Sequence, residues 1–237
     1  MRECEVIIQK ALKEGRSSML TNEAQQICSL HNIPNPKAYL TSNVHEAVLK
    51  AKDIGFPVAL KIVSPQIIHK SDVGGVILNI TNVRELEAQY KKMATEIPQR
   101  APTAKILGIL VSEMMPSSTE LIVGSVRDNQ FGPSVMFGMG GIFTEIYNDS
   151  AFRVAPIERI DAWNMIHELK GSRILEGARG KPPADLDAII NLLLNVSELV
   201  IEHDAISQLD FNPVMAYPDG VCAVDTRIII EKKMGAT

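Results

Sequence analysis

The segment around His69 combines residue types that suit phosphate chemistry. His69 follows an apolar run with Lys61 at its centre and precedes the glycine pair Gly74 and Gly75. A neutral imidazole is a competent nucleophile, and lysines hold phosphate oxygens in phosphoryl-transfer sites. Ordinary explanations exist too: His69 could belong to a surface loop, and Lys61 could guard a sheet edge or extend its ammonium to solvent. The rest of the chain weighs against them because it carries further parts of such a site.

The last two predicted strands carry oxygen ligands. They flank the turn 218–220. If the two central turn residues are either Pro218 and Asp219 or Asp219 and Gly220, the numbers of any two residues that face each other across the hairpin add to an odd sum. Asp225 is then on the same face as Asn212 and Asp210. Two carboxylates and an amide on one face suit a hard cation such as Mg²⁺. A solvated outer face is the alternative, and a three-residue loop or a bulge at Pro213 would break the parity.

A glycine-rich segment follows another predicted strand. Gly140 and Gly141 lead to Glu145, Asp149 and Arg153. Glycines let backbone amides approach an anion closely, although tight-turn geometry explains such a cluster as well. Arg153 could pair with Asp149 or bind phosphate.

The predicted strand that ends near Met115 loses its alternation of apolar and polar residues at 111–115, a segment that includes Glu113. A strand exit of this kind could bind adenine through main-chain groups, or it could be a simple loop. Glu120 opens the following strand and suits the surface as well as a site.

The spacing of apolar residues predicts the elements that position these groups. The predicted helices are 5–14, 22–30, one capped by Ser42 or Asn43 and closed by Gly55, one capped by Asn82 with Glu85 three residues on, 160–169, and a long one from Asp185. The predicted strands are 38–40, 58–63, 75–80, 105–115, 120–127, 134–138, 206–212 and 221–229. The strands from 105 to 138 are expected to form an antiparallel meander. The sum is an α+β protein of two lobes, with an N-terminal helical extension at 1–18, a first lobe at 19–108 and a second at 109–237.

Composition excludes several classes of function. The 237 residues are 46% hydrophobic and 22% charged with a net charge of −4, so there is no basic footprint for nucleic acid. No apolar stretch approaches the roughly 20 residues of a membrane helix. The three cysteines, Cys4, Cys28 and Cys222, are odd in number and lack metal spacing, which is typical of buried thiols in a reducing compartment. A cytoplasmic location is expected.

Four segments together resemble the ATP-grasp fold, and specifically the β subunits of ADP-forming acyl-CoA synthetases (acetate–CoA ligase, ADP-forming), which are relatives of succinyl-CoA synthetase. These segments are 55–61, 68–76, 137–145 and 209–214 with 223–225. They span nearly the whole chain in the expected order. The phrase from His69 to Gly75 departs from the more glycine-rich, arginine-containing loop of succinyl-CoA synthetase, which puts a histidine where that relative has only loop backbone. The resemblance implies an α+β ATP-grasp fold whose two lobes bind ATP or ADP between them.

The resemblance also implies a role for each site residue. Nucleotide phosphates would meet Lys61, Gly74 and Gly75. Adenine and ribose would lie near Glu113 and Met115, with Glu120 lining the same site. Asn212 and Asp225 would hold Mg²⁺. Asp210 would orient a phosphohistidine, and His69 would be the second relay histidine. The residues implied for the phosphate path or the intersubunit contact are Gly140, Gly141, Glu145, Asp149 and Arg153.

The implied reaction is acyl-CoA + ADP + phosphate = carboxylate + ATP + CoA, through a phosphohistidine relay. It requires a CoA-binding α subunit with a phosphorylatable histidine, because the chain carries no Gly-rich βαβ unit for CoA. The resemblance implies an α2β2 heterotetramer. A stand-alone ATP-grasp carboxylate ligase and a non-catalytic nucleotide-sensing module are the alternatives. The sequence does not reveal the acid, the physiological direction, the ADP or GDP preference, the stoichiometry, or whether His69 is phosphorylated in every turnover.

Overall fold

A computed structural model describes residues 2–67, 69–141, 149–177 and 182–231 of the chain. The chain forms two compact units. Unit 1 comprises Met1–Met19, Glu23–Asn35 and Ser117–Thr237, and unit 2 comprises Leu20–Asn22 and Pro36–Pro116. The predicted boundaries differ from this division. Residues 1–18 belong to unit 1 rather than to a separate extension, and the later boundary falls after residue 116 rather than after residue 108.

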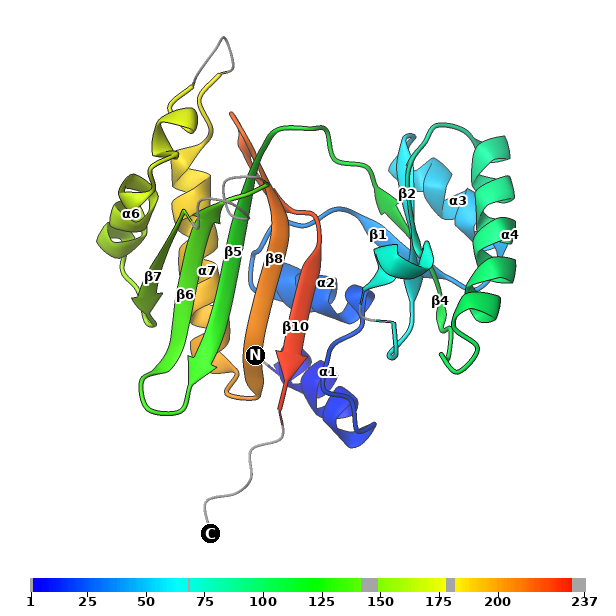
Figure 1. The fold of residues 1–237 in the computed structure, drawn as a ribbon, viewed down its shortest axis with the longest axis horizontal. Coiled ribbons are helices and arrows are strands. Elements are labelled where there is room, and N and C mark those ends of the chain that lie inside the picture. The colour runs from blue at the N-terminus through cyan, green and yellow to red at the C-terminus, as the bar shows by residue number, and fades with distance from the viewer. Residues whose placement is uncertain (1, 68, 142–148, 178–181, 232–237) are drawn as a thin grey trace. The chain divides into compact units, whose positions relative to one another are not determined.

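Unit 2 contains a four-stranded antiparallel sheet in the order β1-β4-β2-β3. Strands β1, β2 and β4 are labelled in Figure 1. The strands are β1 (Ala38–Thr41), β2 (Val58–Val63), β3 (Val76–Ile80) and β4 (Gly108–Glu113), and a 3-10 turn, η1 (Lys70–Val73), precedes β3. The helices α3 (Val44–Ile54) and α4 (Val83–Arg100) pack on one face of this sheet, where Leu60, Ile62, Leu86 and Ile97 form a buried core. All four predicted unit 2 strands and both helices are confirmed within a few residues.

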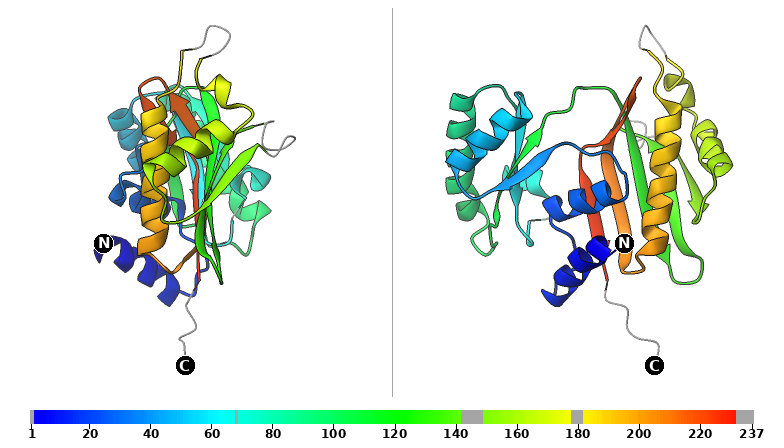
Figure 2. Two further views of the ribbon diagram at one scale, coloured as in Figure 1. Left: turned by 90° about the vertical axis from the view of Figure 1, so that its left-hand side faces the viewer. Right: turned by 180° about the vertical axis from the view of Figure 1, so that it is seen from behind.

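Unit 1 contains a six-stranded sheet in the order β10-β8-β5-β6-β7, with β9 paired to β8. The strands are β5 (Thr119–Asp128), β6 (Gly132–Met139), β7 (Ser150–Val154), β8 (Ile206–Tyr217), β9 (Gly220–Ala223) and β10 (Thr226–Ile230). The helices α1 (Arg2–Lys13), α2 (Thr21–Leu30), α6 (Arg159–Glu168) and α7 (Leu186–Glu202) lie on one side of this sheet, and η2 (Ser172–Ile174) follows α6 (Figure 2).

The core of unit 1 lies between the sheet and these helices. The apolar spacing of α7 places Ile189, Leu193 and Val196 inward, where they are buried together with Phe137 and Phe211 of the sheet. The opposite face of the sheet bears β8 residues such as Gln208 and Asp210, which are exposed. One sheet face is therefore available to position polar side chains.

The predicted meander is partly wrong. Strands β5 and β6 are adjacent and antiparallel as expected, but β4 lies between β1 and β2 in the sheet of unit 2. Every residue of β4 from Ile109 to Ser112 is buried, so both faces of this strand are covered. The segment 150–154 was not predicted as a strand, yet it forms β7 against β6.

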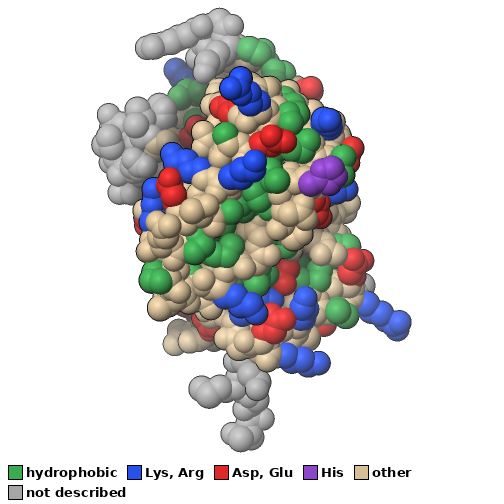
Figure 3. Space-filling model, turned by 90° about the vertical axis from the view of Figure 1, so that its right-hand side faces the viewer, with side chains coloured by type: hydrophobic (Ala, Val, Ile, Leu, Met, Phe, Trp, Pro, Cys, Tyr) green, Lys and Arg blue, Asp and Glu red, His purple; other side chains and the backbone are tan. Residues whose placement is uncertain are grey.

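Two further observations concern the helices and the surface. Among the described residues, no helix is long and apolar enough to cross a membrane. On the face drawn in Figure 3, acidic and basic side chains are interspersed among polar and apolar ones, without a broad basic area.

Candidate functional site

Lys61 lies in the middle of β2, an inner strand of unit 2. It is paired with Val76 on one side and Leu110 on the other, and only 6% of it is exposed. A lysine that guards a sheet edge or extends to solvent is incompatible with this position. Leu60 and Ile62, its neighbours, belong to the apolar core, so Lys61 points to the opposite face of the sheet. This position is compatible with a cation that meets an anionic ligand.

The loop that carries His69 is tied to this strand. His69 itself is exposed and directly precedes η1. The N–H of Gly75 donates to the carbonyl of Lys70 at 2.7 Å, and the carbonyl of Gly75 accepts the N–H of Ile62 at 2.8 Å. A Cβ on Gly75 would lie 2.5 Å from Cγ2 of Ile62, so only glycine permits this approach. The His69 loop therefore returns to β2 one residue away from Lys61.

The exit of β4 is held by hydrogen bonds within unit 2. The strand ends at Glu113, whose N–H donates to the carbonyl of Lys37 at 2.8 Å and whose carboxylate accepts the N–H of Lys37 at 3.2 Å. Met114 donates its N–H to Pro57 at 3.3 Å, and Met115 is half-buried. Glu113 thus has a structural partner, and the nucleotide roles of Glu113 and Met115 stay predictions.

In unit 1, the glycines after β6 have a packing explanation. The N–H of Gly140 donates to the carbonyl of Glu120 at 2.7 Å, and a Cβ on Gly140 would lie 2.8 Å from the Glu120 backbone. Gly141 adopts a left-handed φ of 62° beside Glu120. The close contact of Gly140 with Glu120 and the left-handed φ of Gly141 explain why glycines occupy this part of the segment. Glu145 lies outside the described residues.

The prediction that Arg153 pairs with Asp149 or binds phosphate is wrong in its first alternative. Asp149 is buried and accepts the backbone N–H groups of Lys170 and Gly171, both at 2.8 Å. Arg153 forms an ion pair with Glu168, which raises the pKa of its guanidinium. Each residue therefore has its own structural partner, whatever further role it has.

The terminal hairpin has the register that the parity rule predicts. Tyr217 pairs with Gly220, so Pro218 and Asp219 form the turn, and every pair sums to an odd number. Asn212 donates its N–H to the carbonyl of Asp225 at 3.2 Å, which places the two residues directly opposite each other. The irregularity near Pro213 shifts the register between β8 and β5. The pairing between β8 and β9 is regular. An amide oxygen and a carboxylate on one strand face are donors that Mg²⁺ prefers, so these residues fit that ion.

Arg227 was missed by the sequence analysis, although the same parity rule would have found it. It lies directly opposite Asp210, and both line a pocket of about 270 Å³ on the sheet. Desolvation raises the pKa of Asp210; Arg227 opposes this shift, and Asp225 adds to it. Asp210, Arg227 and Asp225 therefore interact electrostatically within unit 1.

The sequence and the fold of the chain are similar to those of known proteins. The model of the ATP-grasp domain family matches residues 10–230. The β subunit of acetate–CoA ligase [ADP-forming] I from Pyrococcus furiosus is 46% identical over 94% of this chain and 96% of its own length. Acetate–CoA ligase [ADP-forming] I from Archaeoglobus fulgidus is 43% identical over 97% of this chain but only 33% of its own length. A solved structure of acetyl-coenzyme A synthetase 1 from Ca. Korarchaeum cryptofilum is 43% identical, with a TM-score of 0.84, and the match covers 96% of this chain and 100% of that chain. That structure contains coenzyme A and Mg-AMPPCP, and its phosphohistidine segment points towards the nucleotide binding site.

Proposed function

Since the chain belongs to the ATP-grasp family, as a β subunit of the ADP-forming acyl-CoA synthetases, we propose that it is the nucleotide-binding subunit of an enzyme that converts acyl-CoA, ADP and phosphate into a carboxylate, ATP and CoA. The observation that carries the proposal is the hairpin register, which sets Asp225 opposite Asn212 in a chain with this family's sequence. We place the enzyme in the cytoplasm, which the three free buried thiols of Cys4, Cys28 and Cys222 support.

Lys61 binds the phosphate oxygens of the nucleotide. Its burial on an inner strand, away from the apolar core, supports this role because phosphoryl transfer depends on placement and charge neutralisation. Gly74 and Gly75 add no side chain of their own, and Gly75 lets the adjacent loop lie close to β2. Asn212 and Asp225 hold Mg²⁺, which when bound neutralises phosphate charge. Glu113 and Met115 lie near adenine and ribose, and Glu120 lines the same site.

His69 relays the phosphoryl group. An imidazole nitrogen of His69 attacks the phosphorus of a phosphohistidine on the partner subunit, and that N–P bond breaks as the His69 N–P bond forms. A β-phosphate oxygen of ADP then attacks, which releases His69 and forms ATP. The exposure of His69 supports this role because a partner must reach it. Asp210 orients the incoming imidazole by accepting its N–H.

A CoA-binding α subunit with the first phosphorylated histidine supplies the other half of the reaction, in an α2β2 assembly. The longer relative from Archaeoglobus fulgidus supports this partner because this chain matches only a third of it. We keep Gly140, Gly141, Glu145, Asp149 and Arg153 as residues of the phosphate path or the subunit contact.

The test combines the chain with its α subunit and measures ATP formed from acyl-CoA, ADP and phosphate. His69→Ala should abolish both ATP formation and labelling of this chain by radioactive phosphate. His45→Ala, at another exposed histidine of unit 2, is the matched control and should retain both. Full activity of His69→Ala would reject the relay. Turnover by the isolated chain with a simple acid would point to the stand-alone ligase instead.

A further inference from the structure

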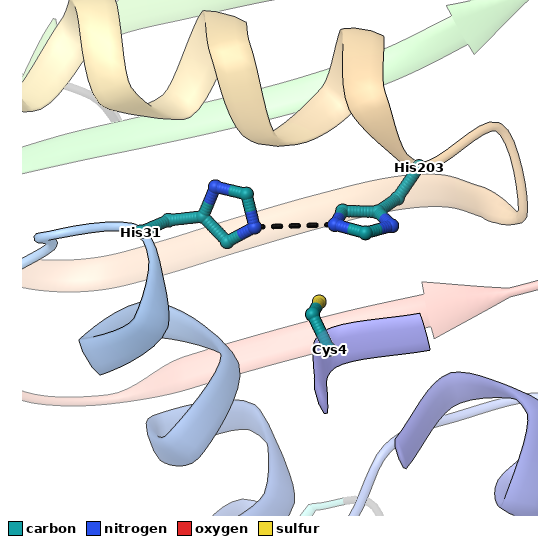
Figure 4. Close-up of side chains that lie close together, drawn as sticks. All are labelled: Cys4, His31 and His203. Carbon is teal, nitrogen blue, oxygen red and sulfur yellow. Dashed lines mark hydrogen bonds between the residues drawn. The ribbon is translucent and has the colours of Figure 1, made fainter. Parts of the chain in front are cut away.

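Three side chains with metal-binding atoms meet beneath the helices of unit 1, outside the nucleotide-site residues. Cys4 lies in the first turn of α1, His31 directly follows α2, and His203 directly follows α7 (Figure 4). All three are buried, with 0%, 8% and 4% of their surface exposed, respectively. Backbone hydrogen bonds to Ile27 and Leu199 hold the two histidines at the helix ends. The packing of three helices thus positions the cluster.

The ligand atoms have spacings that suit a small ion. Nε2 of His31 lies 3.1 Å from Nε2 of His203, and one ring nitrogen of each histidine and the sulfur of Cys4 all lie within 4.8 Å of one another. In tetrahedral zinc coordination, two nitrogens are about 3.3 Å apart and nitrogen and sulfur about 3.6 Å apart. The ring nitrogens therefore already have nearly the required separation. In Figure 4 the sulfur points toward the rings.

A second observation concerns the outer nitrogen of His203. Its Nδ1 is buried and makes no hydrogen bond within the described part of the chain, but Oε2 of Glu5 lies 3.4 Å away. Only one of the two facing Nε2 atoms can carry a hydrogen in the present pair. Metal-binding histidines commonly direct the other ring N–H to a carboxylate, which fixes the ring. Glu5 is placed for this outer contact.

An acidic pocket lies beside the cluster. A pocket of about 450 Å³ is lined by four carboxylates, those of Glu5, Glu202, Asp204 and Glu231, against one lysine, Lys13. Glu5 belongs both to this pocket and to the surroundings of His203. An acidic hollow of this kind raises the local concentration of cations.

We propose that Cys4, His31 and His203 bind a divalent transition metal ion of the zinc class, with Glu5 as the outer partner of His203. Thiolate and imidazole ligands select such an ion over Mg²⁺. Burial raises the pKa of Cys4 to about 11 and lowers the pKa of His31. Binding displaces the thiol proton to solvent, and the added charge of the ion faces the Glu5 carboxylate. The ion joins the start of α1 to the ends of α2 and α7, which makes it a tether of the N-terminal helix.

The test uses the full chain, stripped with a chelator and titrated with Zn²⁺ in competition with a chromogenic chelator. We expect one tight zinc ion per chain and a rise in Tm of roughly 5 to 10 °C at a free zinc concentration about 100-fold above Kd. Co²⁺ in place of Zn²⁺ should give a thiolate charge-transfer band in the near ultraviolet. The absence of this band in the wild-type chain would overturn the proposal.

Variants assign the ligands. Cys4→Ser and His203→Gln should abolish the cobalt band or weaken zinc binding at least 10-fold. Cys222→Ser makes the same change at another buried cysteine, Asp225→Asn alters the proposed magnesium ligand, and both should leave binding intact. Glu5 is half exposed, so Glu5→Gln spares the core and should weaken zinc binding about 10-fold, even if the buried variants do not fold. Unchanged binding in Cys4→Ser or Glu5→Gln, or loss only in Asp225→Asn, would show that zinc binds elsewhere.

Discussion

The environment of Lys61 separates the two interpretations that its sequence allows. A mid-strand lysine is compatible with a sheet edge, with solvent or with a ligand, and local sequence does not distinguish them. Pairing with both β3 and β4 makes β2 an inner strand, and the core residues Leu60 and Ile62 occupy its other face. Strand order, a non-local property, therefore supports the functional interpretation.

Lys61→Met tests this interpretation. A hydrogen bond to a charged group contributes about 1.5–3 kcal/mol, so loss of the ammonium group should weaken ATP and ADP binding about 10- to 100-fold. Calorimetric titration measures the change. Lys52→Met, at an exposed lysine of α3, is the matched control and should bind nucleotide normally. Equal affinity in Lys61→Met and the wild type would remove Lys61 from the site.

Gly75 sets how closely the His69 loop approaches β2. Gly75→Ala places a Cβ 2.5 Å from Cγ2 of Ile62 and 2.9 Å from the carbonyl oxygen of Lys70, so the loop must shift. We expect a loss of about 1–3 kcal/mol in unfolding free energy, measured by urea denaturation, together with reduced ATP formation. Gly124→Ala, where the nearest atoms lie at 3.3 and 3.4 Å, should cost less. A neutral Gly75→Ala would mean that the close approach is not required.

The helices α3 and α4 begin in the same way, and their starts were correctly predicted. Asn43 and Asn82 accept the N–H groups of Glu46 and Glu85, and each glutamate reaches back to the residue before the cap. Helix capping is a contact between residues three or four positions apart, so the chain needs no tertiary information to specify it.

Glu46 gives this arrangement a pH dependence. The backbone N–H and the hydroxyl of Ser42 donate to its carboxylate, which lowers the pKa of Glu46 below its ordinary value of 4.5. A carboxylate with a lowered folded pKa contributes stability above its unfolded pKa and loses it as pH falls through the folded value. The urea midpoint of Glu46→Gln should thus be below that of the wild type at pH 7, and the difference should shrink below pH 4.5. A difference that is constant across this range would contradict the prediction.

The hairpin of β8 and β9 shows what turn length and strand periodicity can predict and what they cannot. A two-residue turn fixes the parity of every pair, so Asp225 could be placed opposite Asn212 from sequence. Parity could not show that the described helices of unit 1 cover the other face of the sheet, where Phe211 is buried. That coverage leaves Asp210 and Arg227 beside an open pocket.

The N-terminal segment is part of the body of unit 1. Cys4, Ile8 and Ala11 of α1 are fully buried, and the N–H of Met19 donates to Ile228 of β10 at 2.9 Å. Arg16 forms two hydrogen bonds with Glu23, at 2.6 and 2.9 Å, and about a tenth of each side chain is exposed. This buried ion pair links the segment after α1 to α2.

Removing one partner of that pair should destabilise the protein strongly. Arg16→Met leaves the Glu23 carboxylate buried beside an apolar side chain, which costs about 3 kcal/mol of unfolding free energy. Urea denaturation measures the loss. Arg159→Met breaks the exposed pair with Asp187 and should cost less than about 1 kcal/mol. Similar losses in the two variants would show that the burial of Arg16 does not matter.

The sequence by itself determined most of the elements, the hairpin parity and the family, because helix caps, turns and apolar periods act between residues close in the chain. Only the tertiary structure decided which strands share a sheet, so it moved β4 out of the predicted meander and made β2 an inner strand. It also brought Cys4 to His31 and His203, although the two histidines are 172 residues apart. Such convergence depends on how whole helices pack on a sheet, and that packing leaves no fixed spacing in the sequence.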